Sequence, residues 1–287
     1  MSIDSAGTIS LGDLTVPRFG YGTMRLTGPH IFGPPADRDE AVRVLRRAVD
    51  AGVRVIDTAW YYGPDVANEI LAEALAPYPD DLVIVTKLGG ARTSDGGWHS
   101  FIAPEQLREG VEHDLRQLGL DSVPVTHLRW MENRDVGFIE ALDGILALVA
   151  EGKIQRIGLS NIDESQLDLA LAKTPVASVS NEYSVISRDV DSLVERCARE
   201  GIAFLPFFPL GASPRTSGAG VSDSAAVTAV ADRLGASAAQ VALSWLLHRS
   251  PALLPIPGTS SVAHLEDNLA AVDLKLSTED MAELDTA

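Results

Sequence analysis

Short apolar segments and longer amphipathic segments alternate through most of this chain. The apolar segments have the length of buried strands, and the amphipathic ones repeat apolar residues every three or four positions, as helices do. Gly52, Gly152 and Gly201 each follow an amphipathic segment and precede an apolar one. Because glycine commonly ends helices, the pattern predicts a helix–glycine–strand unit that recurs along the chain.

Eight apolar segments predict strands, at residues 19–24, 53–56, 82–87, 123–130, 154–160, 176–180, 202–207 and 252–256. Helices are predicted between them. Asp37 or Asp39 is expected to cap the first helix, Asp65 the second, and Pro104 opens the third. Residues 89–100 are glycine-rich and polar, and an irregular loop is predicted there.

The alternation of strands with helices predicts an α/β fold with a parallel sheet, and eight strands favour closure into a (β/α)8 TIM barrel. The weak alternation from Thr8 to Val16, around Gly12-Asp13, predicts a β-hairpin that covers the bottom of the barrel. An open doubly wound sheet is the alternative, but no Gly-x-Gly-x-x-Gly follows the first strand. Since no break in composition separates the units, residues 1–287 are expected to form one domain.

A net charge of −17 over 287 residues argues against nucleic acids and anionic membrane surfaces as partners. The single cysteine, Cys197, leaves no intrachain disulfide and is expected to be a small core residue. Residues 1–5 lack the features of a signal peptide, and no apolar run approaches the ~20 residues of a membrane span. These features favour a cytoplasmic protein. No metal site is expected, and the oligomeric state stays open, with a monomer as one option.

Candidate chemistry lies at the ends of the second and third predicted strands. Asp57 follows the segment 53–56, Tyr62 comes five residues later, and Lys87 ends the next strand. If these strands are neighbours, a charged lysine lowers the tyrosine pKa from about 10, and the aspartate holds the lysine in place. The three residues together predict a general acid for a carbonyl group. Each alone has an ordinary explanation, as a cap, a packed ring or a solvated cation.

Three further segments at strand ends predict a dinucleotide site. Residues 256–261 lead from the last strand into a helix, and helix N-termini with small residues bind phosphate through free amides. Residues 158–161 offer hydroxyl and amide groups for a carboxamide, and Phe207 offers a flat ring for a nicotinamide. Capping or core packing explains each segment alone, but their common position favours a dinucleotide.

The segment Asp57-Thr58-Ala59-Trp60-Tyr61-Tyr62-Gly63, followed by Thr86-Lys87, resembles the signature of the aldo-keto reductases, and the likeness runs from Phe19 to Asn268. The resemblance implies a (β/α)8 barrel that transfers hydride from a nicotinamide cofactor, NADPH rather than NADH, to an aldehyde or ketone. It implies that Asp57, Tyr62 and Lys87 are catalytic, with Tyr62 as the acid.

The same resemblance implies binding positions along the strand ends. The cofactor positions are Gly22, Thr23, Met24, Asp57, Ser160, Asn161, Ser180, Phe207, Phe208, Leu210, Gly211, Gly258, Thr259, Ser260, Ser261, His264 and Asn268. Substrate contacts are expected from Met24, Tyr61, Trp98 and Trp130.

The fourth catalytic position departs from the family pattern. Most members have a histidine there, but this strand ends Leu128-Arg129-Trp130, so Arg129 takes its place. Arginine is a permanent planar cation, which is expected to lower the pKa of Tyr62 further and to grip a substrate oxygen. Pairing of Arg129 with Asp57 or another carboxylate is the alternative. His127, two residues earlier on the same face, is expected to be a polar interior residue.

The cofactor positions depart as well. Ser180 stands where a glutamine is usual, and Gly258 and His264 stand where many relatives have lysine and arginine. These exchanges weaken the expectation of a tight 2′-phosphate site, although a protonated His264 would add positive charge.

The segments 181–183, 206–211 and 258–265 are most similar to a bacterial branch of the family that reduces pyridoxal to pyridoxine. This likeness implies NADPH-dependent reduction of a small aldehyde. Two alternatives stay open. A dinucleotide-binding redox sensor without turnover is compatible with Arg129, and an aldose or sugar dehydrogenase would use the same site.

Overall fold

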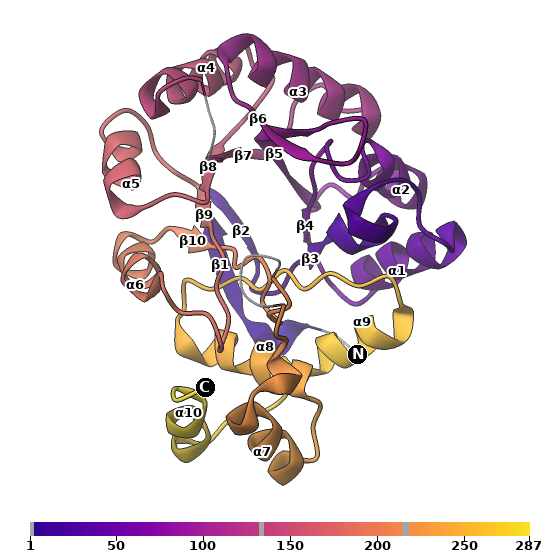
Figure 1. Cartoon of the computed structure of the whole chain (residues 1–287), viewed down its shortest axis with the longest axis vertical. Helices are drawn as coiled ribbons and strands as arrows, with labels where there is room; N and C mark the ends of the chain where they lie inside the picture. The colour runs from indigo at the N-terminus through magenta and orange to yellow at the C-terminus, as the bar shows by residue number, and fades with distance from the viewer. Residues whose placement is uncertain (1–2, 132–134, 214–217) are drawn as a thin grey trace.

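A curled sheet of parallel strands forms the centre of the computed structural model, which describes residues 3–131, 135–213 and 218–287 (Figure 1). The neighbouring strands follow the order β10, β9, β8, β7, β5, β4, β3, and every pair along this path is parallel. Their bounds are β3 Tyr21–Gly22, β4 Val55–Asp57, β5 Val83–Arg92, β7 Val125–Arg129, β8 Ile157–Ser160, β9 Ser178–Ser180 and β10 Ala203–Phe204. The parallel sheet and the barrel are therefore confirmed.

The eighth predicted strand closes the ring without becoming a regular strand. Residues 252–256 carry no strand assignment, yet Leu254 donates a backbone hydrogen bond to Phe204 over 2.9 Å. On the other side, Gly20 donates to the carbonyl of Pro255 over 2.9 Å. Because proline has no N–H group, Pro255 cannot donate to a ladder, which is why the segment pairs only partly. The prediction was right that residues 252–256 lie between the first and last strands of the ring, and wrong that they form a regular strand.

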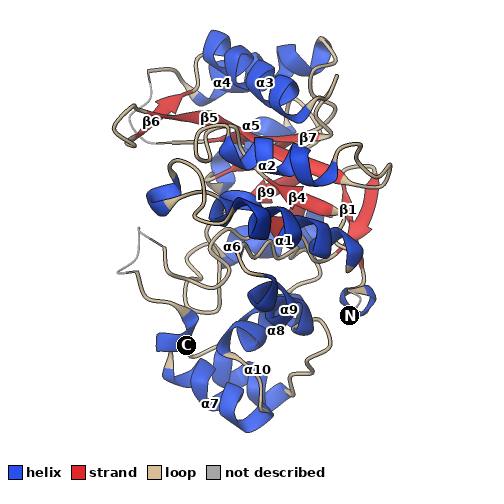
Figure 2. Ribbon diagram, turned by 90° about the vertical axis from the view of Figure 1, so that its right-hand side faces the viewer, coloured by secondary structure: helices blue, strands red, loops and turns tan. Residues whose placement is uncertain are grey.

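Ten α-helices surround the ring in the described part of the chain (Figure 1). Their bounds are α1 Arg38–Asp50, α2 Val66–Leu75, α3 Pro104–Leu118, α4 Phe138–Ala150, α5 Glu164–Leu171, α6 Asp191–Glu200, α7 Ala225–Leu234, α8 Ala238–Arg249, α9 Val262–Ala270 and α10 Thr278–Leu284. Two short 3₁₀ turns, η2 Thr23–Leu26 and η3 Pro29–Ile31, precede α1. Figure 2 shows α7 and α10 together on one side of the molecule, away from the strands.

The helix ends follow the predicted chemistry except at α2. Asp37, rather than Asp39, caps α1, since its carboxylate accepts from the Glu40 amide over 2.8 Å. Gly201 follows α6 with a left-handed φ of 69°, a conformation that costs glycine little. Asp65 stands at the start of α2 but makes no side-chain cap, because its carboxylate faces His113 at 3.6 Å instead. The predicted capping role of Asp65 was wrong.

Two apolar layers hold the fold together. The larger layer lies between strands and helices, and the smaller one fills the inside of the ring with residues such as Val55, Val85 and Val125. The hairpin of β1 (Thr8–Leu11) and β2 (Leu14–Pro17) adds Leu11 and Val16 to the inner layer. Burying one such side chain contributes roughly 1.5–3 kcal/mol. The hairpin thus covers the bottom of the barrel, as predicted, and Figure 2 shows it at the end opposite to strand β6 (Trp98–Phe101).

The segment predicted as a loop at 89–100 is a hairpin. Strand β5 continues to Arg92 and pairs antiparallel with β6 (Trp98–Phe101), which is joined to it by a turn around Gly96. Its glycines serve close packing as well as turns: a Cβ at Gly89 would lie 2.3 Å from the carbonyl oxygen of Arg129. The glycine-rich composition was therefore misread as irregular structure.

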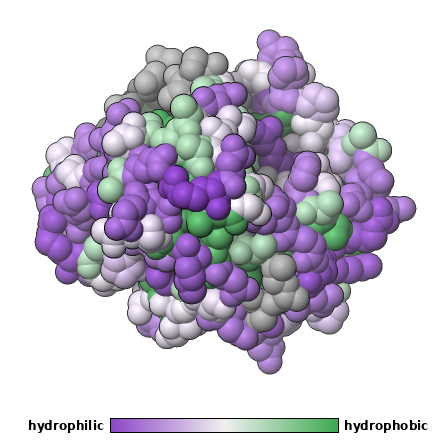
Figure 3. Space-filling model, turned by 90° about the horizontal axis from the view of Figure 1, so that it is seen from below, coloured by the Kyte–Doolittle hydropathy of each residue, from purple (hydrophilic) through white to green (hydrophobic). Residues whose placement is uncertain are grey.

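The face in Figure 3 is mostly hydrophilic, with small apolar areas between polar side chains. Cys197 is fully buried in α6, as predicted. Within the described ranges, no helix has both the length and the apolar composition needed to cross a membrane.

Candidate active site

A buried ion pair lies where the second and third strands of the ring end. Asp57 is the last residue of β4 and Lys87 lies in β5, and these two strands are adjacent and parallel. The Lys87 ammonium donates to Oδ1 of Asp57 and, over 3.3 Å, to the carbonyl of Thr58. The two residues are 4% and 1% exposed. Burial raises the pKa of Asp57 above its ordinary value, and the charge and hydrogen bond of Lys87 oppose that rise. Pairing reduces the cost of burying the two groups.

Tyr62 completes the predicted trio. Its ring lies over the lysine, with the Lys87 ammonium 5.1 Å from the ring centroid. Burial raises the pKa of Tyr62, the charge of Asp57 raises it further, and the charge of Arg129 opposes both. The predicted net lowering was wrong because desolvation outweighs the cations. The phenol is consequently protonated at neutral pH, which is the form that a proton donor requires.

Arg129 extends from the end of β7 toward the same space. Its Nη1 donates to the hydroxyl of Ser160 over 3.4 Å, and its guanidinium carbon lies 5.2 Å from the centre of the Phe207 ring. Among the described residues, no carboxylate forms an ion pair with Arg129. The alternative of a structural ion pair with Asp57 is therefore not what the structure shows.

His127 lies deeper in the ring and is fully buried. Its Nε2 lies 2.8 Å from the hydroxyl of Ser178, and a Cβ at Gly158 would lie 2.1 Å from the imidazole. Burial, together with the charges of Lys87 and Arg129, lowers the pKa of His127 to about 3. It is a neutral polar residue of the barrel interior, as predicted.

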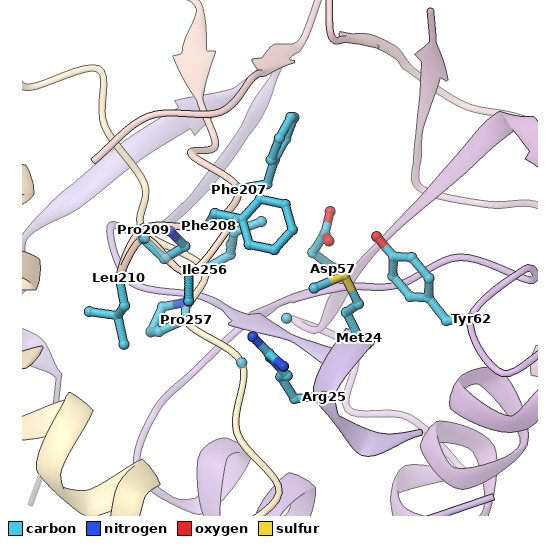
Figure 4. A pocket seen from close by; sticks show the side chains of 14 residues that line it. Met24, Arg25, Asp57, Tyr62, Phe207, Phe208, Pro209, Leu210, Ile256 and Pro257 are labelled. Carbon is cyan, nitrogen blue, oxygen red and sulfur yellow. The ribbon is translucent and has the colours of Figure 1, made fainter. Parts of the chain in front are cut away.

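A pocket of about 140 Å³ opens beside these residues. In Figure 4, Phe207 and Phe208 lie on one side of it and Tyr62 on the other, with Asp57 between them. The predicted positions that line it are Gly22, Met24, Asp57, Tyr62, Phe207, Phe208, Leu210, Gly211 and Gly258. Lining residues outside the predicted set are Arg25, Pro209, Ala212, Ile256 and Pro257. Arg25 could have been predicted as a lining residue from the sequence, because it is a basic residue directly after Met24, a predicted cofactor position.

Close backbone contact shapes one wall of this pocket. A Cβ at Gly22 would lie 2.8 Å from the carbonyl oxygen of Ile256, and a Cβ at Gly258 would lie 2.5 Å from that of Gly22. Any side chain at either position would push the end of β3 away from the closing segment. A second pocket of about 410 Å³ adjoins the first and shares Met24, Arg25 and Phe208 with it. Ser260 lines this second pocket.

Other predicted cofactor positions surround the pocket without lining it. Ser160 and Ser180, at the ends of β8 and β9, are fully buried. The Ser180 hydroxyl has no hydrogen-bond partner among the described residues. Asn161 has a left-handed φ of 61° and donates to the carbonyl of Trp130 over 2.6 Å. Thr23 is fully buried, and its hydroxyl donates to Thr58 rather than facing the pocket.

In the segment predicted to bind phosphate, one backbone amide has a protein partner that sequence reasoning missed. Ser261 caps α9, accepting from the amide of His264 over 3.5 Å, and Thr259 Oγ1 accepts from the Ser261 amide over 3.2 Å. The carboxylate of Glu40, on α1, accepts from the amide of Val262 over 2.9 Å. A protein carboxylate thus already occupies one of the free amides expected to bind phosphate. His264 is exposed and Asn268 is buried.

Of the three aromatic residues predicted to touch substrate, Tyr61 packs against Tyr62, and none of the three lines either pocket. Tyr61 is 1% exposed and meets the rings of Tyr62 and Trp98 edge to face, at 5.4 and 5.7 Å. Its hydroxyl has no hydrogen-bond partner among the described residues. Trp98 is 43% exposed on β6, and Trp130 packs on Phe138 at 5.3 Å. Neither tryptophan lines the two pockets described above.

The barrel and the hairpin agree with comparison to known proteins. Residues 18–287 match the model of the aldo/keto reductase family, and the chain belongs to that family. It is an oxidoreductase of this class.

Among its relatives, the chain is 46% identical over 286 residues to pyridoxine 4-dehydrogenase of Escherichia coli (strain K12), covering 98% of each chain. It is 39% identical over 280 residues to an uncharacterized oxidoreductase of Schizosaccharomyces pombe, covering 98% of this chain and 89% of the other. A solved aldo/keto reductase from Klebsiella pneumoniae, in complex with NADP and acetate, superposes with a TM-score of 0.79 at 29% identity. That match covers 97% of this chain and 94% of the other.

Proposed function

We propose that this enzyme reduces small aldehydes with NADPH, and that pyridoxal is its substrate and pyridoxine the product. The observation that carries the proposal is the buried Asp57–Lys87 pair beneath Tyr62 at the wall of a pocket. The likeness to pyridoxine 4-dehydrogenase, at 46% identity over nearly the whole chain, supports the choice of substrate.

The pocket residues fit a nicotinamide cofactor. Phe207 and Phe208 line the pocket with flat apolar surfaces. The Ser180 hydroxyl, which does not line the pocket, is buried and has no hydrogen-bond partner among the described residues. A buried hydroxyl without a partner is costly, so a carboxamide that engages Ser180 would relieve that cost. The bound cofactor supplies the hydride. Two solved structures that are similar to this chain, both from Klebsiella pneumoniae, are complexes with NADP and NADPH.

The residues of this chain supply the proton and the orientation. Tyr62, kept neutral by burial, donates its phenolic proton to the carbonyl oxygen as the hydride arrives at the carbon. The tyrosinate that results is negative beside the Lys87 ammonium, so the lysine stabilises the transition state more than the ground state. Asp57 keeps the lysine in place and balances its charge before the reaction.

Two groups are suited to holding a hydroxylated pyridine ring. Arg129 has guanidinium hydrogens that no described carboxylate occupies, and it can bind a phenolate oxygen. The Tyr61 hydroxyl is buried and has no hydrogen-bond partner among the described residues, so a polar substituent of the substrate would satisfy it.

A panel of aldehydes with NADPH or NADH tests the proposal. Turnover of pyridoxal with NADPH, at a higher kcat/KM than for glucose or xylose, is the expected result. Measurable NADPH binding without turnover of any carbonyl would contradict it and favour a redox sensor. Faster oxidation of a sugar than reduction of pyridoxal would favour the sugar dehydrogenase.

A further inference from the structure

A chain of buried hydrogen bonds lies behind the Asp57–Lys87 pair, on the helix side of the strands. The hydroxyl of Thr58 donates to Oδ1 of Asn68 over 2.8 Å, and Nδ2 of Asn68 donates to Oδ1 of Asp114 over 2.8 Å. Thr58 follows β4, Asn68 belongs to α2 and Asp114 to α3. All three side chains are fully buried. These hydrogen bonds therefore connect the edge of the active site to helices α2 and α3.

Thr58 is the member that reaches the active site. Its carbonyl accepts from Lys87 over 3.3 Å, and its amide donates to the carbonyl of Val85 over 2.8 Å. Its hydroxyl also accepts from the hydroxyl of Thr23 over 2.8 Å. Every polar group of Thr58 thus has a hydrogen-bond partner. The side-chain hydrogen bonds therefore help to fix the direction of the carbonyl that accepts from Lys87.

Asp114 sets the direction of the whole chain. The NH₂ group of Asn68 donates to Oδ1 of Asp114, so the side-chain oxygen of Asn68 faces Thr58. The Thr58 hydroxyl must then donate to Asn68 and accept from Thr23. A fully buried carboxylate is expensive, and an apolar residue on α3 would be cheaper for the fold. Because Asp114 is not the residue that the stability of the fold alone would favour, it is expected to have a functional role.

We propose that Asp114 and Asn68 are positioning residues for Lys87: through Thr58 they aim the carbonyl that holds the ammonium group beside Asp57 and Tyr62. The proposal rests on the proposed function of Tyr62 and Lys87 in proton donation. It predicts an effect on the chemical step rather than on binding, because the Phe207 and Gly258 walls of the pocket take no part in this chain.

The first test is a pair of substitutions at Thr58. Thr58→Val keeps the shape and the backbone but removes the hydroxyl, and it should lower kcat by about 10- to 100-fold, the scale of a small misplacement of a catalytic group. Thr58→Ser restores the hydroxyl and should recover kcat to within about threefold of wild type. The KM for pyridoxal and the NADPH dissociation constant, measured by fluorescence, should change by less than about threefold in both variants.

The second test is a pair at Asp114. Asp114→Leu breaks the chain and should lower kcat as Thr58→Val does. Asp114→Asn can still accept from Asn68 through its own amide oxygen, and it should keep most of kcat. The double variant Thr58→Val/Asp114→Leu should be no slower than the worse single variant, because both changes interrupt one chain.

Ser244→Ala is the control. Ser244 is a buried residue of α8 whose hydroxyl donates to the carbonyl of Leu274 over 2.9 Å, outside the chain between Asp114 and Lys87. Its kcat should stay near wild type. Wild-type kcat in Thr58→Val, or an equal loss of kcat in Ser244→Ala, would overturn the inference. If Asp114→Leu does not fold, the Thr58 pair decides. Absence of wild-type turnover on every aldehyde would instead overturn the proposed function.

Discussion

The two ends of the candidate cleft are built differently. At one end, Asp57 and Lys87 are almost fully buried and paired with each other before any ligand is present. At the other end, the start of α9 is partly open to solvent, and Glu40 from α1 already accepts from the amide of Val262. His264 is exposed there.

Because of this difference, we expect the buried end to determine the rate of the chemical step and the α9 end to determine the affinity for the cofactor. Charges in a dry interior act strongly and cannot be replaced by water, so a change at the buried end should abolish turnover. Exposed charges are screened by water and salt, so a change at the α9 end should only adjust binding. The following expected outcomes test that contrast, beginning with the largest effect.

Tyr62→Phe should remove nearly all turnover, by about a thousandfold or more, because only the transition state requires the proton. Binding of NADPH should stay within about tenfold of wild type, since the ring that packs over Lys87 is retained. Steady-state kinetics and fluorescence titration measure both quantities. An equal loss of cofactor binding would mean that Tyr62 is structural, and the contrast between the two ends would fail.

Asp114→Asn should raise stability at alkaline pH. Burial raises the pKa of Asp114 from 3.8 to about 7, while hydrogen bonds from Asn68 and Thr86 and the charge of Lys87 oppose the rise and Asp65 adds to it. Between these two values the folded protein keeps a proton that the unfolded chain has released, so stability falls as pH rises through this window.

At pH 8 the asparagine variant should therefore be more stable than wild type, on the order of 2–4 kcal/mol, and the two should converge below pH 4. Urea unfolding at several pH values measures the difference. A variant that is less stable than wild type at pH 8 would show that ionised Asp114 stabilises the fold.

Arg129→Met should change substrate selectivity. It removes the cation that lies near Tyr62 and over Phe207 while keeping an apolar side chain of similar length. The kcat/KM for pyridoxal should fall by ~2 kcal/mol or more relative to benzaldehyde, the scale of a charged hydrogen bond. If both aldehydes lose activity equally, Arg129 serves the proton donor or the fold rather than the choice of substrate.

Glu40→Gln should affect only the nucleotide end. Glutamine keeps an oxygen for the Val262 amide but removes a negative charge from the place expected to receive phosphate. NADPH should bind about two- to fivefold more tightly, with little change for NADH and a smaller effect at high salt. Asp39→Asn, the same loss of charge at an exposed position one residue earlier, is the control. An equal gain with the control would indicate a general effect of net charge.

The alternation of apolar and amphipathic segments was sufficient to predict the barrel, because each strand must be apolar to be buried on both faces. The hairpin under the barrel, the caps at Asp37 and Gly201, and the meeting of Asp57, Tyr62 and Lys87 also followed from local sequence. Misreadings occurred where composition was ambiguous. The glycines in residues 89–100 resemble a loop, but they lie in a hairpin, and Gly89 is required by the close backbone of the neighbouring strand at Arg129.

What the sequence determined alone was the order of the elements and the identity of the groups at the strand ends, since these depend on periodicity and nearest neighbours. What only the tertiary structure decided was the environment of each group. Burial raises the pKa of Tyr62 despite nearby cations. Glu40 accepts a hydrogen bond from the amide of Val262 at the start of α9, although 222 positions separate the two residues in the sequence. Asp114 reaches Thr58 only through Asn68. Desolvation and hydrogen bonding between distant segments depend on packing in three dimensions, which no local pattern records.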